Sequence, residues 1–284
     1  MNILSFDIEE WFHIKFDEDF FDQKNINNFE SRLDQNINYI LDLLDNSNNK
    51  GTFFCLGWVA RKFPHIVKEI DKRGHEIGSH SDEHKLLTNL NRDEFKEDLK
   101  SSVDEIERLI GKKITLYRAP SFSITDQNLW VFDELINFGI KVDCSVFPAK
   151  RSDGGMSGYT TPSPSIIKIK SGQTIKEFPI NTIKIIGKNI IFSGGGYFRL
   201  VPYSLLKLLF NRSKYIMTYF HPRDFDPDQP VLDNLSFIKY FKSYVGLKSS
   251  KKKIEKLLRD FDFMNVIEAD QLIDWDKVPI HNVQ

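Results

Sequence analysis

The chain has 284 residues, of which 40% are hydrophobic and 28% charged, and these values are typical of a globular protein with a sizeable core. They exclude a chain that is disordered throughout. The 39 basic and 40 acidic residues leave a formal net charge of −1, so no global field attracts nucleic acid or an anionic bilayer. Any partner must therefore be recognised by a local surface. Single α/β barrels commonly reach this length, and we expect one domain over residues 1–284.

Location and redox state are inferred from what the sequence lacks. Met1 leads directly into Asn2–Phe6, without the basic and apolar regions of a signal peptide. No run of about eighteen apolar residues could span a bilayer. We therefore expect a cytoplasmic protein with no integral membrane segment. Cys55 and Cys144 lie far apart in apolar surroundings, which favours buried free thiols over a metal or redox pair.

The N-terminal half alternates predicted strands and helices. A short apolar run that ends in acids predicts the first strand, and Asn91 with Glu94 forms a capping-box pattern before the third helix, which Gly111 closes. Four strand–helix units in succession favour parallel strands in a barrel or an open sheet, because right-handed crossovers through helices require that arrangement. The predicted strands cover 3–10, 52–56, 76–79, 114–118 and 140–146, and the helices cover 33–44, 59–73, 91–110 and 126–138.

The C-terminal half is less regular. Gly, Ser, Thr and Pro dominate residues 151–164 and predict a surface loop inside an insertion over about 147–198. Three short strands in that insertion, at 166–170, 175–179 and 182–186, are expected to form an antiparallel meander. A helix at 202–211, a strand at 215–220, helices over 235–261 and a final strand at 265–267 follow. We expect a core of residues 2–222 and a helical extension over about 223–284.

Two histidines, His80 and His84, lie four residues apart directly after a predicted strand. In a helical turn they would share one face, about 5–6 Å apart at Cβ, which is close enough to bind one metal ion. Surface histidines also meet this spacing by chance. The first strand, however, ends in Asp7-Ile8-Glu9, and strand alternation would point both carboxylates the same way. Two histidines and one carboxylate are a common metal-ligand set that leaves a position for water.

Asp7 and Arg118 are predicted to neutralise each other. Asp7 is costly to bury in its apolar strand without a cation, and Arg118, at the end of strand 114–118, needs an anion for the same reason. Arg118 beside Asp7 would hold the carboxylate ionised and ready to accept a proton. The alternative is a surface arginine with a buried stem.

His221 lies at the end of a predicted buried strand, and Pro222 prevents the ladder from continuing. By itself it would be interpreted as a core histidine with satisfied hydrogen bonds. Beside a metal and a carboxylate base it becomes a candidate general acid for a leaving group. Asp143, at the end of its own strand, could orient either His221 or Arg118, and the sequence does not distinguish the two.

These blocks, in this order, resemble the polysaccharide deacetylase family, which is carbohydrate esterase family 4 with its nodulation-type deacetylase homology domain. Ser5–Glu9 resembles the first motif, whose leading Asp is the base, and His80–His84 resembles the metal-binding histidine motif. Arg118–Ser121 is similar to the Arg-x-Pro motif that tethers the base. The resemblance implies that the Ser121 backbone N–H helps to form an oxyanion hole.

Two further blocks extend the resemblance over about residues 2–222. Asp143 resembles the acid of the fourth motif, and Phe220-His221 resembles the final motif. The family fold implies a distorted (β/α) barrel of about seven strands. The first motif departs from the common pattern of two adjacent Asp, since position 8 is Ile. In the acid-x-acid subgroup the second acid, here Glu9, binds the metal.

The resemblance implies a metal-dependent hydrolase that removes N-acetyl groups from amino sugars of a bacterial polysaccharide or its precursor and releases acetate. Glu9, His80 and His84 would hold Zn²⁺, with Co²⁺ or Ni²⁺ as alternatives, while Asp7 acts as base and His221 as acid. The motif combination most resembles deacetylases linked to bacterial surface and extracellular polysaccharide production. A related hydrolase of cyclic amides or ureides and an inactive sugar-binding member remain alternatives. The glycan and the oligomeric state are not determined by the sequence.

Aromatic residues beside the motifs suggest how a sugar could be bound. Flat apolar rings suit the faces of pyranose rings, although core packing is the alternative for each of them. The residues are Trp11, Phe12, Trp58, Phe122, Tyr197 and Phe198.

Overall fold

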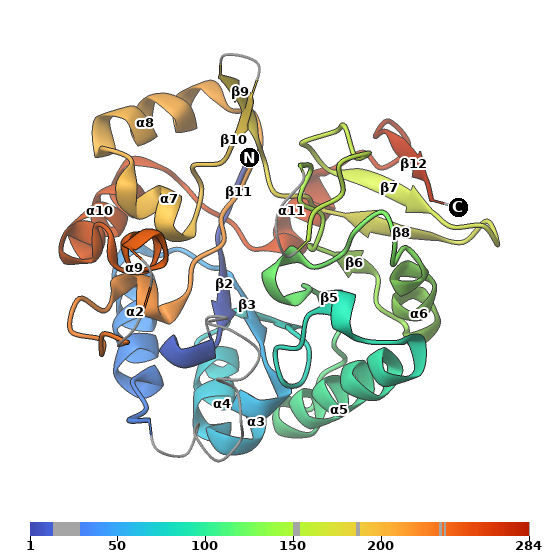
Figure 1. The fold of residues 1–284 in the computed structure, drawn as a ribbon, viewed down its shortest axis with the longest axis horizontal. Helices are drawn as coiled ribbons and strands as arrows, with labels where there is room; N and C mark the ends of the chain where they lie inside the picture. The colour runs from blue at the N-terminus through green and yellow to red at the C-terminus, as the bar shows by residue number, and fades with distance from the viewer. Residues whose placement is uncertain (14–28, 150–153, 186–187, 233–234, 236, 284) are drawn as a thin grey trace.

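A curved sheet of mostly parallel strands forms the centre of the computed structural model, which describes residues 1–13, 29–149, 154–185, 188–232, 235 and 237–283 (Figure 1). All neighbouring strands from β2 to β8 run parallel, as the strand–helix alternation predicts. In spatial order the sheet contains β2 (Ser5–Ile8), β3 (Thr52–Cys55), β4 (Glu76–Ser79), β5 (Leu116–Tyr117), β6 (Val142–Asp143), β8 (Thr174–Glu177), β7 (Ser165–Lys168) and β12 (Ile280–Asn282).

The sheet closes into a distorted (β/α) barrel, in agreement with the expected fold class. β1 (Asn2–Ile3) pairs in parallel with β11 (Ile216–Met217), and Phe6 bridges Phe220 beyond them. On the other side of β11, hydrogen bonds to the Asn181 side chain take the place of a backbone hydrogen-bond ladder. The Asn181 Oδ1 atom accepts hydrogen bonds from the Met217 N–H and from the Ser193 hydroxyl, both at 3.0 Å. The barrel is therefore irregular where β8 and β11 face each other.

Helices surround the parallel strands in the N-terminal half (Figure 1). The capping box at Asn91 is present, and Gly111 ends its helix with φ +68°, as predicted. The predicted helix 59–73 is divided instead, because Pro64 lacks the N–H that a continuous helix would use and begins a new one. The helices are α2 (Leu33–Ser47), α3 (Gly57–Lys62), α4 (Pro64–Lys72), α5 (Arg92–Ile110) and α6 (Trp130–Phe138).

Strand β2 shows how the chain separates the core from the site. Leu4, Phe6 and Ile8 belong to the large apolar core, where the Phe6 ring lies 4.9 Å from that of Phe53. Ser5 and Asp7 alternate with them and point to the opposite side, where both contact a buried arginine. The alternation of one short strand thus places an acid inside the barrel.

The predicted antiparallel insertion is present only in part. β7 and β8 form an antiparallel pair, but β8 also pairs in parallel with β6 and so belongs to the barrel sheet. The expected meander does not continue, because β9 (Ile183–Ile185) pairs with β10 (Lys188–Ile190) rather than with β8. Pro179 has no N–H to extend the ladder where the chain leaves β8.

The C-terminal region is largely helical, as predicted, but it differs in three respects, one of which is the strand β12 near its end. Gly246, at φ +72°, interrupts the predicted helix 235–261. The strand predicted at 265–267 is wrong, because Asn265 caps a helix by accepting a hydrogen bond from the Glu268 N–H at 2.8 Å. The helices are α7 (Gly195–Leu200), α8 (Tyr203–Arg212), α9 (Phe237–Tyr244), α10 (Leu247–Asp260) and α11 (Val266–Leu272).

Candidate metal centre and active site

Polar residues follow the carboxyl ends of four barrel strands. Glu9 comes directly after β2, His80 after β4, and Arg118 after β5, while His221 lies beyond β11. The carboxyl ends of parallel strands meet at one edge of the barrel, so residues more than 200 positions apart lie side by side there. This edge is the candidate site.

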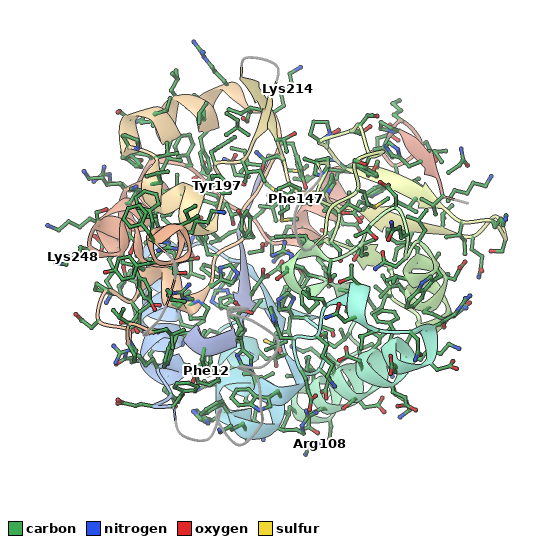
Figure 2. The ribbon with its side chains drawn as sticks, in the orientation of Figure 1. Phe12, Arg108, Phe147, Tyr197, Lys214 and Lys248 are labelled. Carbon is green, nitrogen blue, oxygen red and sulfur yellow. The ribbon has the colours of Figure 1, made fainter. Side chains whose placement is uncertain are left out.

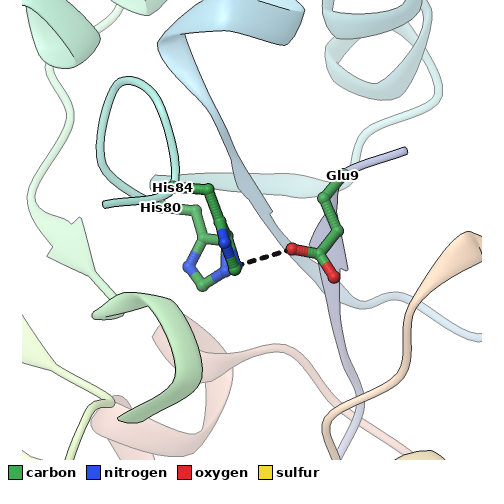
Figure 3. Close-up of side chains that lie close together, drawn as sticks. All are labelled: Glu9, His80 and His84. Atoms are coloured by element: carbon green, nitrogen blue, oxygen red, sulfur yellow. Dashed lines mark ion pairs between the residues drawn. The ribbon is translucent and has the colours of Figure 1, made fainter. Parts of the chain in front are cut away.

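The side chains of Glu9, His80 and His84 converge at this edge (Figure 3). One ligand atom from each lies within 4.8 Å of the others, and the Glu9 Oε2 atom lies 2.7 Å from His84 Nε2. The His80 Nδ1–H donates to the Arg118 carbonyl at 2.8 Å, which leaves its Nε2 atom for a ligand. Such a bond to the far nitrogen is how metal-binding histidines are commonly oriented.

The segment that carries the two histidines is not the helical turn that their spacing predicts. Ser81 and His84 have φ angles of +72° and +60°, and the His84 N–H donates to the Ser81 hydroxyl at 3.1 Å. The loop is also anchored to α3, because the Gly57 N–H donates to the Ser81 carbonyl at 3.0 Å. The two rings still meet, with centroids 5.4 Å apart. Their backbone strain is typical of a functional loop.

A divalent cation fits these three residues. Burial would raise the pKa of Glu9, but the nearby imidazoles of His84, His221 and His80 hold it well below its usual range. Burial lowers the pKa of His80 to about 4, so its ring is neutral at pH 7, as a metal ligand must be. The Glu9 Oε2 atom is buried and makes no well-aligned hydrogen bond. One carboxylate and two imidazole nitrogens are a common ligand set for zinc.

Arg118 and Asp7 form the buried pair that the sequence predicts. The Arg118 guanidinium donates to Asp7 Oδ1 at 2.7 Å and to the Ser5 hydroxyl at 2.8 Å, and it lies 4.1 Å from the centre of the Phe54 ring. Arg118 is fully buried, so the surface alternative is wrong. Because Arg118 occupies Oδ1, the other Asp7 oxygen faces His221, with its Oδ2 atom 3.9 Å from His221 Nε2.

His221 is held by an acid that the sequence analysis did not single out. The Asp224 Oδ2 atom accepts hydrogen bonds from the backbone N–H of His221 at 2.9 Å and from its Nδ1–H at 3.1 Å. The other oxygen of Asp224 forms an ion pair with Arg199 Nε at 3.0 Å. Burial alone would lower the pKa of His221, but Asp224 and the charges of Glu9 and Asp7 raise it to about 9. Because the Nδ1 atom of His221 is bonded to Asp224, the Nε2 atom is the one that faces the site.

Asp143 orients neither His221 nor Arg118, within the part of the chain that the structure describes. It faces Glu177, its register partner on β8, and accepts a hydrogen bond from the Ser145 hydroxyl at 2.5 Å. Burial raises the pKa of both carboxyl groups, because their charged forms are poorly solvated there. The Ser145 hydroxyl also accepts from the Ala119 N–H at 2.8 Å. Asp143 therefore supports the turn after Arg118 rather than a site residue directly.

Ser121 lies in that turn, η4 (Pro120–Phe122), three residues after Arg118. Ser121 and Phe122 both have left-handed backbones, with φ angles of +52° and +54°. Two consecutive non-glycine residues in this region are unusual and are found where surrounding contacts impose them. The turn is compatible with the role that the family resemblance assigns to the Ser121 N–H.

Two family models match the sequence. The model described as polysaccharide deacetylase matches residues 20–136, and a domain of unknown function, DUF3473, matches residues 144–271. Residues 20–136 of the chain therefore resemble the polysaccharide deacetylase family. The second match adjoins the first and contains His221 and Asp224.

Similar proteins agree with this family. A peptidoglycan-N-acetylglucosamine deacetylase of Bacillus cereus is 38% identical over 96 residues, which are 34% of this chain and 35% of that protein. The peptidoglycan-N-acetylmuramic acid deacetylase PdaA of Bacillus subtilis is 35% identical over 81 residues, 28% of this chain and 31% of that protein. These matches span only about a third of each relative.

A solved structure shares the fold of this chain over nearly its whole length. The crystal structure of a putative polysaccharide deacetylase from Mycobacterium smegmatis superposes with a TM-score of 0.66, covering 99% of this chain and 92% of the other. The two sequences are 17% identical, so this likeness concerns the fold.

Most of the aromatic residues beside the deacetylase motifs belong to the core. Trp11, Phe12, Phe122 and Phe198 are buried, whereas Tyr197 is half exposed and is labelled in Figure 2. Core packing is therefore the correct interpretation for those four. Cys55 and Cys144 are buried free thiols, as predicted, and burial raises the pKa of both.

Proposed function

We propose that this protein is a metal-dependent deacetylase that removes N-acetyl groups from amino sugars and releases acetate. The observation that carries the proposal is the opposition of Asp7 and His221, 3.9 Å apart and each held on its far side by a charged partner, beside the convergent Glu9, His80 and His84. The match of residues 20–136 to the deacetylase family and the reactions named for the relatives support the same chemistry.

Glu9, His80 and His84 would hold the metal, for which we propose Zn²⁺, with Co²⁺ or Ni²⁺ as alternatives. Such an ion supplies Lewis acidity, polarising an amide carbonyl and acidifying water at the site. The protein supplies the base. Because Arg118 occupies Oδ1 of Asp7, the Oδ2 atom is the one that accepts the proton of the attacking water.

His221 would act as the general acid in this proposal. Its Nδ1–H is bonded to Asp224, so the Nε2 atom faces the site and can donate a proton to the departing amine. The charge of Asp224 raises the pKa of His221, which favours the protonated ring that a general acid needs. The Ser121 N–H would stabilise the negative charge that develops on the carbonyl oxygen.

We propose a bacterial surface or extracellular polysaccharide, or its precursor, as the substrate. We also propose that residues 1–284 act as one catalytic domain. Asp7 and Glu9 precede the matched polysaccharide deacetylase segment, His80 and Arg118 lie within it, and His221 lies in the DUF3473 segment. Neither matched segment contains the complete set of residues.

Acetate release tests the proposed function. The purified protein is analysed for bound metal and then incubated with N-acetylglucosamine oligomers, peptidoglycan fragments and allantoin-like ureides. We expect acetate from at least one N-acetylated sugar, and loss of both metal and activity in His80→Ala and His84→Ala. Sugar binding without acetate release would indicate an inactive binding protein, and cleavage of the ureide alone would indicate the alternative hydrolase.

A further inference from the structure

Helices α7 and α9 together expose an apolar surface that the proposed reaction does not use. The exposed fractions of Phe237 and Ile238 are 82% and 66%. Contiguous exposed apolar patches on soluble proteins commonly mark a binding surface. We call this the α7–α9 surface, and it consists of Tyr197, Leu200, Phe237, Ile238, Tyr240 and Phe241.

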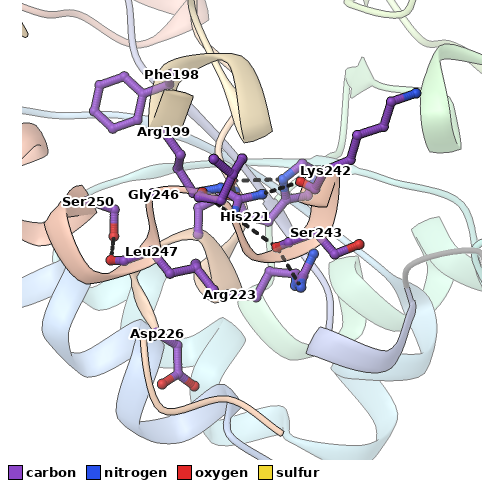
Figure 4. Close-up of polar contacts among 12 residues, drawn as sticks. Phe198, Arg199, His221, Arg223, Asp226, Lys242, Ser243, Gly246, Leu247 and Ser250 are labelled. Atoms are coloured by element: carbon purple, nitrogen blue, oxygen red, sulfur yellow. Dashed lines mark hydrogen bonds and ion pairs between the residues drawn. The ribbon is translucent and has the colours of Figure 1, made fainter. Parts of the chain in front are cut away.

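The α7–α9 surface is held in place from beneath (Figure 4). The Arg199 guanidinium of α7 donates to the carbonyls of Ser243 at 2.8 Å and of Lys242 and Val245 at 3.1 Å, at the end of α9. Arg223 also donates to the Ser243 carbonyl, at 3.3 Å. Buried arginine bonds thus fix the polar side of the helix end, and the apolar side chains face outward.

Helix α9, which carries most of this surface, and the following helix α10 are rich in lysine. Residues 237–256 contain seven lysines and one acid, Glu255, although the whole chain has a net charge of −1. Lys242 of α9 and Lys248 and Lys252 of the following helix α10 are exposed. Aromatic and aliphatic side chains with neighbouring lysines are the composition of helices that lie in a membrane interface.

The positive charge of the neighbouring lysines distinguishes between two partners that could cover this surface, a second copy of the chain and an anionic lipid bilayer. A second copy of the chain in a two-fold dimer would bring lysines close to the same lysines, which costs free energy. An anionic lipid surface instead attracts lysines while its acyl boundary takes up aromatic rings. No helix in the described residues is long and apolar enough to cross a bilayer. We propose that the α7–α9 surface docks onto the interface of an anionic bilayer without spanning it.

Such docking would place the candidate site close to the membrane. Arg199 joins α7 to Asp224, the partner of His221, and Arg223 joins the same turn to α9. The turn is η5 (Pro222–Phe225), which directly follows His221. The docking surface and the active-site histidine therefore share one rigid support. The docking proposal itself does not depend on the reaction.

Vesicle sedimentation tests the proposal with the full chain. Vesicles of phosphatidylcholine alone are compared with vesicles of phosphatidylglycerol and phosphatidylcholine in equal parts. We expect binding to the anionic vesicles that weakens with salt. The triple variant F237S/I238S/F241S is expected to lose at least about tenfold in affinity, because three apolar side chains no longer insert. Lys248→Glu with Lys252→Glu should weaken binding by at least about 25-fold, since each lysine near an anionic surface contributes about fivefold.

The matched control is Leu272→Ser with Ile280→Ser, which removes two exposed apolar side chains from α11 and β12. It should bind vesicles as the wild type does, and all variants should keep the wild-type melting temperature and metal content. Absence of wild-type binding to anionic vesicles, or unchanged binding by the triple variant, would overturn the proposal. A concentration-dependent dimer that only the triple variant abolishes, without vesicle binding, would assign the surface to a second copy and also overturn it.

Discussion

Asp7 and His221 are each fixed by one charged residue on the side away from the site. Arg118 holds Asp7 from the strand end of β5, and Asp224 holds His221 from three residues further along the chain. Arg118, Asp7 and Asp224 are buried, whereas the His221 side chain is 24% exposed, so loss of a partner would leave an uncompensated buried charge on Arg118, Asp7 or Asp224. The roles of the two carboxylates of the first motif can be distinguished by experiment, because Glu9 is the one whose ligand atom lies within 4.8 Å of those of His80 and His84.

Asp7 and Glu9 should respond differently to substitution. Asp7→Asn should retain bound metal and lower kcat by about 10²–10⁴-fold, because the base is lost while the ligands stay. Glu9→Ala should weaken metal affinity by more than about 100-fold, since a direct ligand is removed. Metal content and acetate release measured on both variants check this. Equal metal content in the two variants would contradict the assignment of Glu9 as the third metal ligand.

Asp224 should act on the reaction through His221. Asp224→Asn should lower kcat by at least about tenfold with little change in KM, because the ring loses the negative charge that favours its protonated form. Asp224→Glu should recover part of the loss. Asp226→Asn is the control, because Asp226 lies two residues away and pairs with Arg32, with Oδ1 2.9 Å from Nη2. A similar loss in both variants would indicate a general disturbance of the turn.

At the scale of elements, close backbone contacts hold the irregular part of the barrel together. Gly194 forms an isolated parallel β-bridge with Tyr219, and Tyr219 lies two residues before His221. A Cβ atom at position 194 would lie 2.1 Å from the Tyr219 carbonyl oxygen, far inside contact distance. The glycine is needed here for the close approach of two strands rather than for a special φ angle.

Gly194→Ala should therefore destabilise the protein by about 1–3 kcal/mol or more, because the two strands must separate. It should also lower kcat, since Tyr219 leads into His221. Denaturant unfolding with parallel acetate assays measures both effects. Gly158→Ala is a suitable control, because its nearest new contact would be a side-chain oxygen at 3.4 Å. Equal stability of the two variants would show that the close approach is not rigid.

At the scale of the whole molecule, the C-terminal helix α11 is fastened to the amino ends of the barrel strands. The Glu76 Oε2 atom of β4 accepts hydrogen bonds from the Thr52 hydroxyl at 2.6 Å and from the Ile267 N–H at 3.1 Å. Thr52 in turn accepts from the Val266 N–H at 2.9 Å. Burial raises the pKa of Glu76 from 4.5 to about 7. This connection therefore depends on pH.

The sign follows from the two protonation states. The folded protein favours the neutral form of Glu76, so the contribution to stability is complete below pH 4.5 and is lost as the pH rises through about 7. Glu76→Gln keeps a neutral side chain at every pH. We compare the free energy of unfolding of the variant with that of the wild type at each pH. The difference in favour of the variant should be larger at pH 8 than at pH 4.5 by about 1–3 kcal/mol. Urea unfolding at the two pH values tests this, and parallel curves for both proteins would contradict it.

The sequence by itself determined the alternation of strands and helices and the residues that end the strands. Asp7, His80, Arg118 and His221 could be predicted as neighbours because parallel strands bring their carboxyl ends to one edge, whatever the details of packing. The Asn91 cap and the Gly111 stop were equally predictable, since both are local chemistry.

Only the tertiary structure decided which acid serves which partner. Asp143 faces Glu177 rather than His221, because the register of β6 against β8 places the two acids opposite each other. Asp224 is the acid that bonds to His221, because the tight turn that begins at Pro222 brings its carboxylate back to the ring. The position of β8 in the barrel and the outward apolar side of α9 likewise depend on contacts between distant segments. Strand register and the choice of a buried face are set by the packing of the whole chain, so local patterns do not determine them.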